Sequence, residues 1–233
     1  SIGDAALLIN NGLCDVVLAG GCEAGISKLG LGGFSALRAL STNNENPKQA
    51  SRPFDAKRDG FVPAEGAGMI VVESLQHATK RNANILCEIA GMGVSSDAYH
   101  PVQPDPESKG AILAMERALN NAGIKNEEIN YINAHGTSTP LNDTCETNAI
   151  KKTFEKHAYN IPISSTKSMI GHALGGAGAL EAIATILSIV NQKAHPTINQ
   201  ETPDPECDLN YIPNKFIDLS INYAMSNNFG FVI

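Results

Sequence analysis

The sequence lacks the features that mark several large classes of protein. No apolar run approaches about 20 residues without a polar interruption, so a membrane-spanning helix is not expected. No cleavable signal sequence is expected either, because Ser1 opens directly onto an amphipathic stretch. Lys and Arg number 17 against 24 Asp and Glu, a net charge of −7. This acidic balance argues against nucleic acid as a partner.

Cysteine is scarce and forms no recognisable pattern. The five cysteines include no CxxC pair, and an odd number cannot all pair within one chain. We therefore expect reduced thiols, mostly in the core, and a reducing compartment, the cytoplasm. A disulfide framework or a zinc site is not expected, and no other metal site is indicated.

The 233 residues alternate between strand-like and helix-like patterns, which predicts an α/β fold. Helix-then-strand order at both ends suggests an internal duplication. The last predicted helix is apolar on almost every face, so we expect it to be buried in the middle of three layers. Turn formers dominate 28–61, which predicts a long functional loop. The predicted helices are 2–12, 110–122, 143–154 and 176–192, and the predicted strands, most of them buried, are 14–19, 66–75, 85–95, 129–134, 161–165 and 223–231.

A histidine follows one of these predicted strands directly. His135 and Gly136 stand where α/β folds often place catalytic groups. The hydroxyls of Thr137 and Thr139 are suited to bind a polar chain. The alternative is a plain turn in which His135 satisfies a backbone carbonyl.

A second candidate site follows the strand 161–165 and feeds the long apolar helix. Its glycine and lysine order does not match a phosphate-binding loop. Glu181 lies within the apolar helix and needs a partner, because an unpaired buried charge is costly. Lys167 is the candidate partner, either in an active site or in a purely structural ion pair. His172 and His135 suggest two neutral imidazoles that donate hydrogen bonds to one oxyanion.

Longer motifs surround these residues. The chain contains SRPFDAKRDGFVPAEGAG, AHGTSTPLND, STKSMIGHALGGAGALEA, HPTINQETPDPECDLNYIP and SNNFGF. Together they resemble the β-ketoacyl-acyl carrier protein synthases of the synthase II type, which elongate acyl chains in fatty-acid synthesis. The resemblance covers essentially the whole chain. It implies a thiolase-like fold of layered mixed sheets with buried central helices, in which 1–84 is the remainder of the N-terminal half and 85–233 is the C-terminal half.

The resemblance also implies roles for individual residues. The family uses a Cys-His-His site without a metal or organic cofactor, and its partners are acyl carrier protein and a second copy of the enzyme in a homodimer. The implied catalytic residues are His135, His172, Lys167 and Glu181. The implied substrate-binding residues are Thr137 and Thr139 for the pantetheine arm, and Phe229 and Phe231 for gating of the acyl pocket.

The family's nucleophilic cysteine has no counterpart in this sequence. That cysteine precedes the helix that opens here at Ser1, and none of the five cysteines replaces it. The sequence is therefore interpreted as the C-terminal portion of a synthase, incomplete at both ends and inactive alone. The complete enzyme would condense an acyl-enzyme with malonyl-acyl carrier protein to give 3-oxoacyl-acyl carrier protein. The alternatives are a thiolase, a polyketide condensing domain, or a non-catalytic fragment.

Overall fold

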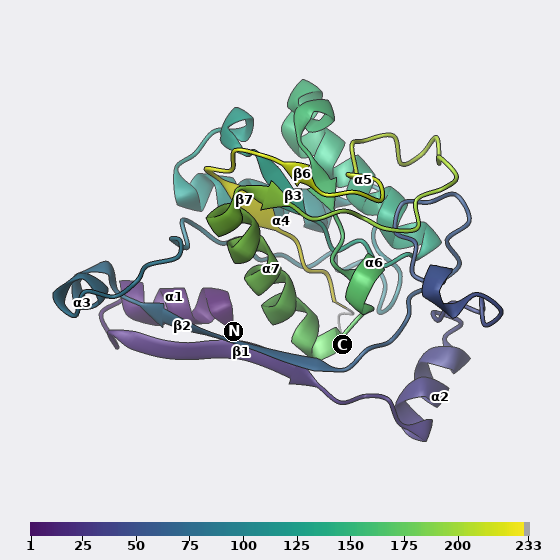
Figure 1. The fold of residues 1–233 in the computed structure, drawn as a ribbon, viewed down its shortest axis with the longest axis horizontal. Helices are drawn as coiled ribbons and strands as arrows, with labels where there is room; N and C mark the ends of the chain where they lie inside the picture. The colour runs from purple at the N-terminus through teal and green to yellow at the C-terminus, as the bar shows by residue number, and fades with distance from the viewer. Residues whose placement is uncertain (231–233) are drawn as a thin grey trace.

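In the computed structural model, which describes residues 1–230, a long apolar helix lies between two sheets (Figure 1). This helix, α7 (Ala177–Asn191), contacts one sheet on one side and β7 of the other sheet on the opposite side. One sheet is the antiparallel pair β1 (Val16–Glu23) and β2 (Gly66–Glu73). The other is parallel, in the order β4-β3-β7: β3 (Tyr131–Asn133), β4 (Ile163–Ser164) and β7 (Ala224–Ser226). A short antiparallel pair completes the strands: β5 (Lys193–Ala194) and β6 (Ile217–Asp218).

Of the remaining helices, α1 packs against the β1–β2 pair, and α4 and α5 pack against the parallel sheet. All four predicted helices are present, as α1, α4, α5 and α7, and their ends follow the local chemistry. Pro140 opens α5, where its missing N–H is not needed. Gly123 ends α4 in the left-handed conformation, with φ +68. The other helices and 3-10 turns are α1 (Ile2–Asn10), α2 (Lys28–Ala36), α3 (Leu75–Lys80), α4 (Lys109–Ala122), α5 (Pro140–Phe154), α6 (Lys167–Ile170), η1 (Pro47–Gln49), η2 (Asn126–Glu128), η3 (Glu155–Asn160) and η4 (Leu174–Gly176).

The main hydrophobic core lies between the parallel sheet and helices α4 and α5. Ile132 on β3, Ile163 on β4 and Ile150 on α5 are completely buried there. A residue on α4, Met115, closes the same cluster. The carboxyl ends of β3 and β4 are therefore held by a well-packed core, and this core fixes the position of the residues that follow them.

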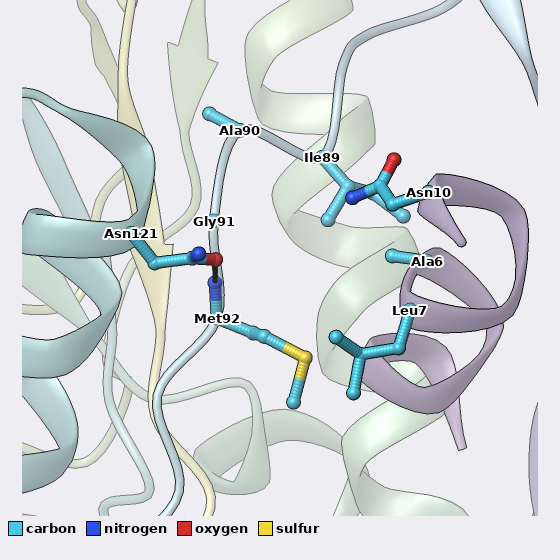
Figure 2. A pocket seen from close by; sticks show the side chains of 8 residues that line it. All are labelled: Ala6, Leu7, Asn10, Ile89, Ala90, Gly91, Met92 and Asn121. Carbon is cyan, nitrogen blue, oxygen red and sulfur yellow. Dashed lines mark hydrogen bonds between the residues drawn. The ribbon is translucent and has the colours of Figure 1, made fainter.

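Two predictions about regular structure were wrong. The range 28–61, predicted as a loop, contains α2, whose N-cap Ser27 accepts a hydrogen bond from Gly30 N. The range 85–95, predicted as a strand, has no strand assignment. It lies against α4 instead, and Met92 N donates to the Asn121 side chain rather than to a neighbouring strand (Figure 2). A Cβ at Gly93 would stand 1.9 Å from Ala114 O, so only glycine permits this close approach.

Burial was also overestimated in three places. The strands β1 and β2 were predicted to be buried, but one face of this pair is open, with Leu18 69% exposed and Val71 57% exposed. Near the end of α7, Leu187 is 52% exposed, so that helix is not buried on every side. Among the five free cysteines only Cys207 is buried, and Cys22 is exposed. For the strands and for α7, the apolar pattern correctly indicated a strand or a helix, but it did not reveal which face has a neighbour.

Within residues 1–230, one helical stretch is long and apolar enough to cross a membrane by length and composition alone. It runs from Leu174 to Asn191 and includes α7. Because α7 contacts both sheets and carries the buried carboxylate of Glu181, we interpret it as a core helix.

The open face of the β1–β2 pair predicts self-association. Val16, Leu18, Met69 and Val71 share this face and are all exposed. Exposed apolar sheet surface of this kind promotes aggregation. We expect the chain by itself to form large species at micromolar concentration, measured by size-exclusion chromatography with light scattering.

Two substitutions separate this face from the rest of the surface. Leu18→Lys with Val71→Lys should shift the profile toward smaller species, because the two residues are cross-strand neighbours. Leu29→Lys, at an exposed leucine on α2, is the matched control and should leave it unchanged. A monodisperse profile with a cooperative thermal transition for the unaltered chain would contradict the prediction.

Candidate active site

His135 is held by a carboxylate at the point where β3 ends. Glu146, completely buried on α5, accepts hydrogen bonds from His135 N (2.9 Å) and Gly136 N (2.8 Å). Ser165 Oγ donates to Gly136 O (2.6 Å). Gly136 has φ +40, and a Cβ there would lie 2.6 Å from Ser165 Cβ. The turn after β3 is therefore fixed from both sides, and it directs the imidazole of His135.

His172 is positioned by the segment before β2. The backbone N–H of His172 donates to Val62 O (2.7 Å), and the backbone carbonyl of His172 accepts from Ala64 N (3.0 Å). The preceding Gly171 has φ +76, and a Cβ at that residue would stand 2.9 Å from both Ala64 Cβ and Val62 O. The close approach and the left-handed backbone both require glycine. The segment 62–64, which is distant in the sequence, therefore holds the backbone of His172 in place.

The two imidazoles face each other in a partly aromatic environment. The ring centroids of His135 and His172 are 5.4 Å apart, with an angle of 85° between the rings. Phe61 packs edge-on against His172 at 5.2 Å, and Phe229 packs against His135 at 5.3 Å. Phe231, the other predicted gating residue, lies outside the described residues. The fold thus brings together the two histidines that the sequence singled out.

Hydrogen bonding determines which nitrogen of each ring carries the proton. Nδ1 of His172 accepts from Leu174 N (3.1 Å), so the ring proton is on Nε2. Nδ1 of His135 lies 3.3 Å from Nζ of Lys167, an ammonium that only donates. Burial lowers the pKa of His172 to about 3 and holds the pKa of His135 well below its ordinary value, with the Lys167 charge adding to both effects. Both rings are therefore neutral, and each has an Nε2–H that can donate.

Lys167 connects His135 to a buried carboxylate. Its Nζ forms an ion pair with Glu181 Oε1 and donates to His135 O (2.6 Å). Both charged side chains are only 1% exposed. Burial raises the pKa of Glu181 to about 7, against the opposing influence of Lys167. Among residues 1–230, Glu181 Oε2 finds no hydrogen-bond partner. The Lys167 side chain therefore holds in place both the turn at His135 and the Glu181 carboxylate on α7.

The two threonines predicted to bind a polar chain lie beside this centre. Thr137 Oγ1 and Thr139 Oγ1 are 2.9 Å apart and share a hydrogen bond. Thr137 is buried, whereas Thr139 is partly exposed. Arg58 Nε donates to Thr139 O (3.2 Å), which ties this turn to the segment before β2. The hydrogen-bonded pair therefore joins a buried residue to a partly exposed one.

Sequence reasoning missed the residues that support the site. Arg58 pairs with Asp143 (3.7 Å) and with Asp204, and these contacts raise its pKa despite burial. Glu146 has a pKa raised by burial to about 7, although it accepts two backbone N–H groups from the histidine turn. The charge-rich run SRPFDAKRDG was a signal for Arg58, because so many charges in a turn-rich segment need partners. Glu146 left no comparable signal in the periodicity of α5.

Cys87, Cys145 and Cys207 do not have the environment of an activated nucleophile. Burial raises the pKa of Cys87 and of Cys145, and it raises the pKa of Cys207 to about 11. An activated thiol has a lowered pKa instead. Within residues 1–230, no group of three or more His, Cys, Asp or Glu side chains is placed to hold a metal ion. The site therefore consists of two hydrogen-bond donors, a cation and a carboxylate.

Comparisons with known proteins identify the family of the chain. The chain matches "Beta-ketoacyl synthase, N-terminal domain" over residues 1–78 and "Beta-ketoacyl synthase, C-terminal domain" over residues 86–201. It is 54% identical to 3-oxoacyl-[acyl-carrier-protein] synthase 2 of Coxiella burnetii over 99% of its length, and it spans 56% of that relative.

Solved structures give the same result. A beta-ketoacyl synthase from Burkholderia phymatum is 43% identical with a TM-score of 0.94, and the match covers 99% of this chain and 55% of that one. A type II polyketide ketosynthase, solved in complex with its acyl-carrier protein, is 45% identical with a TM-score of 0.95 over 97% of this chain and 55% of its own. These matches confirm the predicted thiolase-like fold, and the chain belongs to the beta-ketoacyl synthase family.

Proposed function

We propose that this chain supplies the decarboxylation half of a condensing enzyme, a 3-oxoacyl-acyl carrier protein synthase of fatty-acid elongation. The observation that carries the proposal is the pair of neutral imidazoles, His135 and His172, whose Nδ1 atoms are engaged and whose Nε2–H groups have no hydrogen-bond partner within residues 1–230. Two neutral donors on neighbouring rings, with centroids 5.4 Å apart, suit an oxyanion that exists only after carbon dioxide has left.

The proposed reaction begins with an acyl group on a cysteine that this chain does not supply. Malonyl-acyl carrier protein then loses carbon dioxide, and the electrons of the broken carbon–carbon bond form an enolate with a negative thioester oxygen. The Nε2–H groups of His135 and His172 donate to that oxygen. The enolate carbon attacks the acyl thioester and expels the cysteine thiolate, which gives 3-oxoacyl-acyl carrier protein, two carbons longer.

The neighbouring residues take supporting roles in this proposal. Thr137 and Thr139 bind the pantetheine arm, Phe229 and Phe231 gate the acyl pocket, and Lys167 with Glu181 keeps His135 in place. The partners are acyl carrier protein and a second copy in a homodimer. We place the protein in the cytoplasm and divide it into two thiolase-like units, 1–84 and 85–233. Neither a metal nor an organic cofactor enters these steps.

A polyketide condensing enzyme is the second candidate. The type II polyketide ketosynthase with 45% identity and a TM-score of 0.95 favours it. Both candidates perform the same decarboxylative condensation on carrier-bound substrates, so they differ in the acyl chain accepted. A thiolase would not release carbon dioxide, and an inert fragment would give neither product.

The test requires a protein that contains the missing nucleophile. We define the extended protein as this chain joined to the segments of the Coxiella burnetii relative that flank the matched region. It is incubated with malonyl-acyl carrier protein and either saturated acyl or poly-β-ketoacyl carrier protein. Fatty-acid elongation predicts carbon dioxide release and products from the saturated chains. Products from the polyketone chains alone would favour the second candidate, and no carbon dioxide release would contradict both.

Replacing Lys167 is expected to damage both stability and activity in the extended protein. Lys167→Met leaves the Glu181 carboxylate buried without its cation, and breaking a buried pair in this way typically costs about 3–5 kcal/mol. Urea unfolding measures the loss. The double variant Lys167→Met with Glu181→Leu removes both charges and should recover most of the stability but not the decarboxylation rate. Equal stability of the single variant and the unaltered protein would contradict this prediction.

The neutral state of the second imidazole predicts a distinctive titration. Because burial lowers the pKa of His172 to about 3, the ring stays neutral as pH falls from 8 to 5, where an ordinary histidine gains its proton. Ring ¹⁵N chemical shifts of the extended protein should therefore show a constant Nε2–H tautomer over this range. Free histidine in the same buffer is the reference, and it should gain its proton over this range. Protonation of His172 near pH 6.5 would contradict the assignment.

A further inference from the structure

His195 has no part in the proposed mechanism, yet it lies against the two strands whose ends bear the site. It follows β5 directly and is partly buried. Its Nε2 lies 3.0 Å from Thr166 Oγ1 and 3.1 Å from the Tyr131 hydroxyl. Tyr131 belongs to β3, which leads to His135, and Thr166 immediately precedes Lys167. One imidazole thus contacts both β3 and the segment that follows β4.

The contacts of His195 determine where its proton lies. Nδ1 is 3.1 Å from Pro196 O, and a carbonyl oxygen can only accept, so Nδ1 carries a proton. Burial lowers the pKa of His195 from its ordinary value, so the ring holds a single proton near neutral pH. Nε2 is therefore an acceptor, and a neighbouring hydroxyl must donate to it.

Thr166 is the hydroxyl whose direction follows from its other partner. Asn133 Nδ2 donates to Thr166 Oγ1 (2.9 Å). Glu181 O lies 3.4 Å from the same Nδ2, which agrees with the amide nitrogen being on this side, because a backbone carbonyl cannot donate. The Thr166 oxygen accepts from the amide, which leaves its own proton available to Nε2 of His195. The Tyr131 hydroxyl, the other group close to Nε2, lies nearer to Ser164 Oγ (2.6 Å) and has a hydrogen-bond partner there.

We infer that His195 is a positioning residue of the active site, acting through Thr166 and Asn133 on the turns that carry Lys167 and His135. This inference rests on the proposed function. Asn133 stands two residues before His135, and Thr166 stands one residue before Lys167. The distance from Lys167 Nζ to His135 Nδ1 is 3.3 Å, near the limit of a hydrogen bond, so a small shift of either strand end breaks it.

The test compares two substitutions in the extended protein. His195→Leu fills a similar space but leaves the Thr166 proton without an acceptor, and it should lower the kcat of malonyl decarboxylation about tenfold while KM changes less than about twofold. His195→Gln keeps an acceptor oxygen and should restore most of the rate. The hydrogen bond between Thr166 and His195 is also tested by changing the threonine. Thr166→Val should lower kcat as His195→Leu does, and Thr166→Ser should retain activity. The double variant His195→Leu with Thr166→Val should lower kcat no further than either single variant, because both substitutions remove the same hydrogen bond.

A matched control separates positioning from general damage. His157, on η3, is also partly buried and hydrogen-bonds to Ile129 O (3.0 Å), but the chemistry proposed here does not involve it. His157→Leu should lose stability without losing kcat. If the unaltered extended protein releases no carbon dioxide, the proposed function fails. If it does so and His195→Leu folds with unchanged kcat, or if ¹⁵N shifts place the His195 proton on Nε2, the inference alone is overturned.

Discussion

Replacing either imidazole donor in the extended protein is expected to slow malonyl decarboxylation by about 100-fold or more, while the acylation of the nucleophile stays largely intact. Loss of one such donor to a developing oxyanion typically costs about 3–4 kcal/mol. His135→Ala and His172→Ala each remove one neutral Nε2–H from the pair. Acylation has its own oxyanion, which backbone N–H groups near the nucleophilic cysteine can bind, so we expect it to be spared.

A split assay measures the two half-reactions separately. Acylation is followed with radiolabelled acyl carrier protein, and decarboxylation is followed as carbon dioxide release from malonyl carrier protein. His172→Gln is the informative conservative variant, because its amide retains an N–H donor and should recover part of the rate. His157→Ala, outside the site, is the control for folding. The assignment of roles is wrong if both alanine variants abolish acylation and spare decarboxylation.

Residues placed by short-range chemistry were predictable from the sequence. Buried strands that end in polar residues at 129–134 and 161–165 indicated where His135 and Lys167 would lie, and the structure contains β3 and β4 there. The ion pair with Glu181 followed from the cost of burying a lone carboxylate in an apolar helix. These inferences need only the local pattern and one energetic rule.

Residues placed by contacts far apart in the sequence were not predictable in this way. Glu146 holds the histidine turn through two backbone N–H groups, which no side-chain pattern records. Arg58 reaches Asp143 and Asp204 from a distant loop. The range 85–95 has the composition of a strand, but a strand also needs a hydrogen-bonded neighbour, and Met92 N finds the side chain of Asn121 instead. The composition of a segment therefore does not show whether a neighbouring strand is available to pair with it.

The chain without the flanking segments is expected to show no detectable condensation. Covalent acyl transfer requires a positioned thiolate. Burial raises the pKa of Cys87, Cys145 and Cys207, which keeps these thiols protonated and unreactive near neutral pH. Cys22 is exposed on β1, where it is open to non-specific modification.

Incubation with radiolabelled acyl carrier protein, followed by a denaturing gel and product analysis, measures both adduct and turnover. The extended protein is the positive control, and its version with the relative's nucleophilic cysteine changed to serine should be as inactive in condensation as the chain alone. Cys22→Ser should remove any radiolabel attached nonspecifically to this cysteine without changing turnover. An acyl group on this exposed strand residue is not transferred to the enolate. A thioester on any of the five cysteines that leads to 3-oxoacyl product would overturn the prediction, since this chain would then contain its own nucleophile.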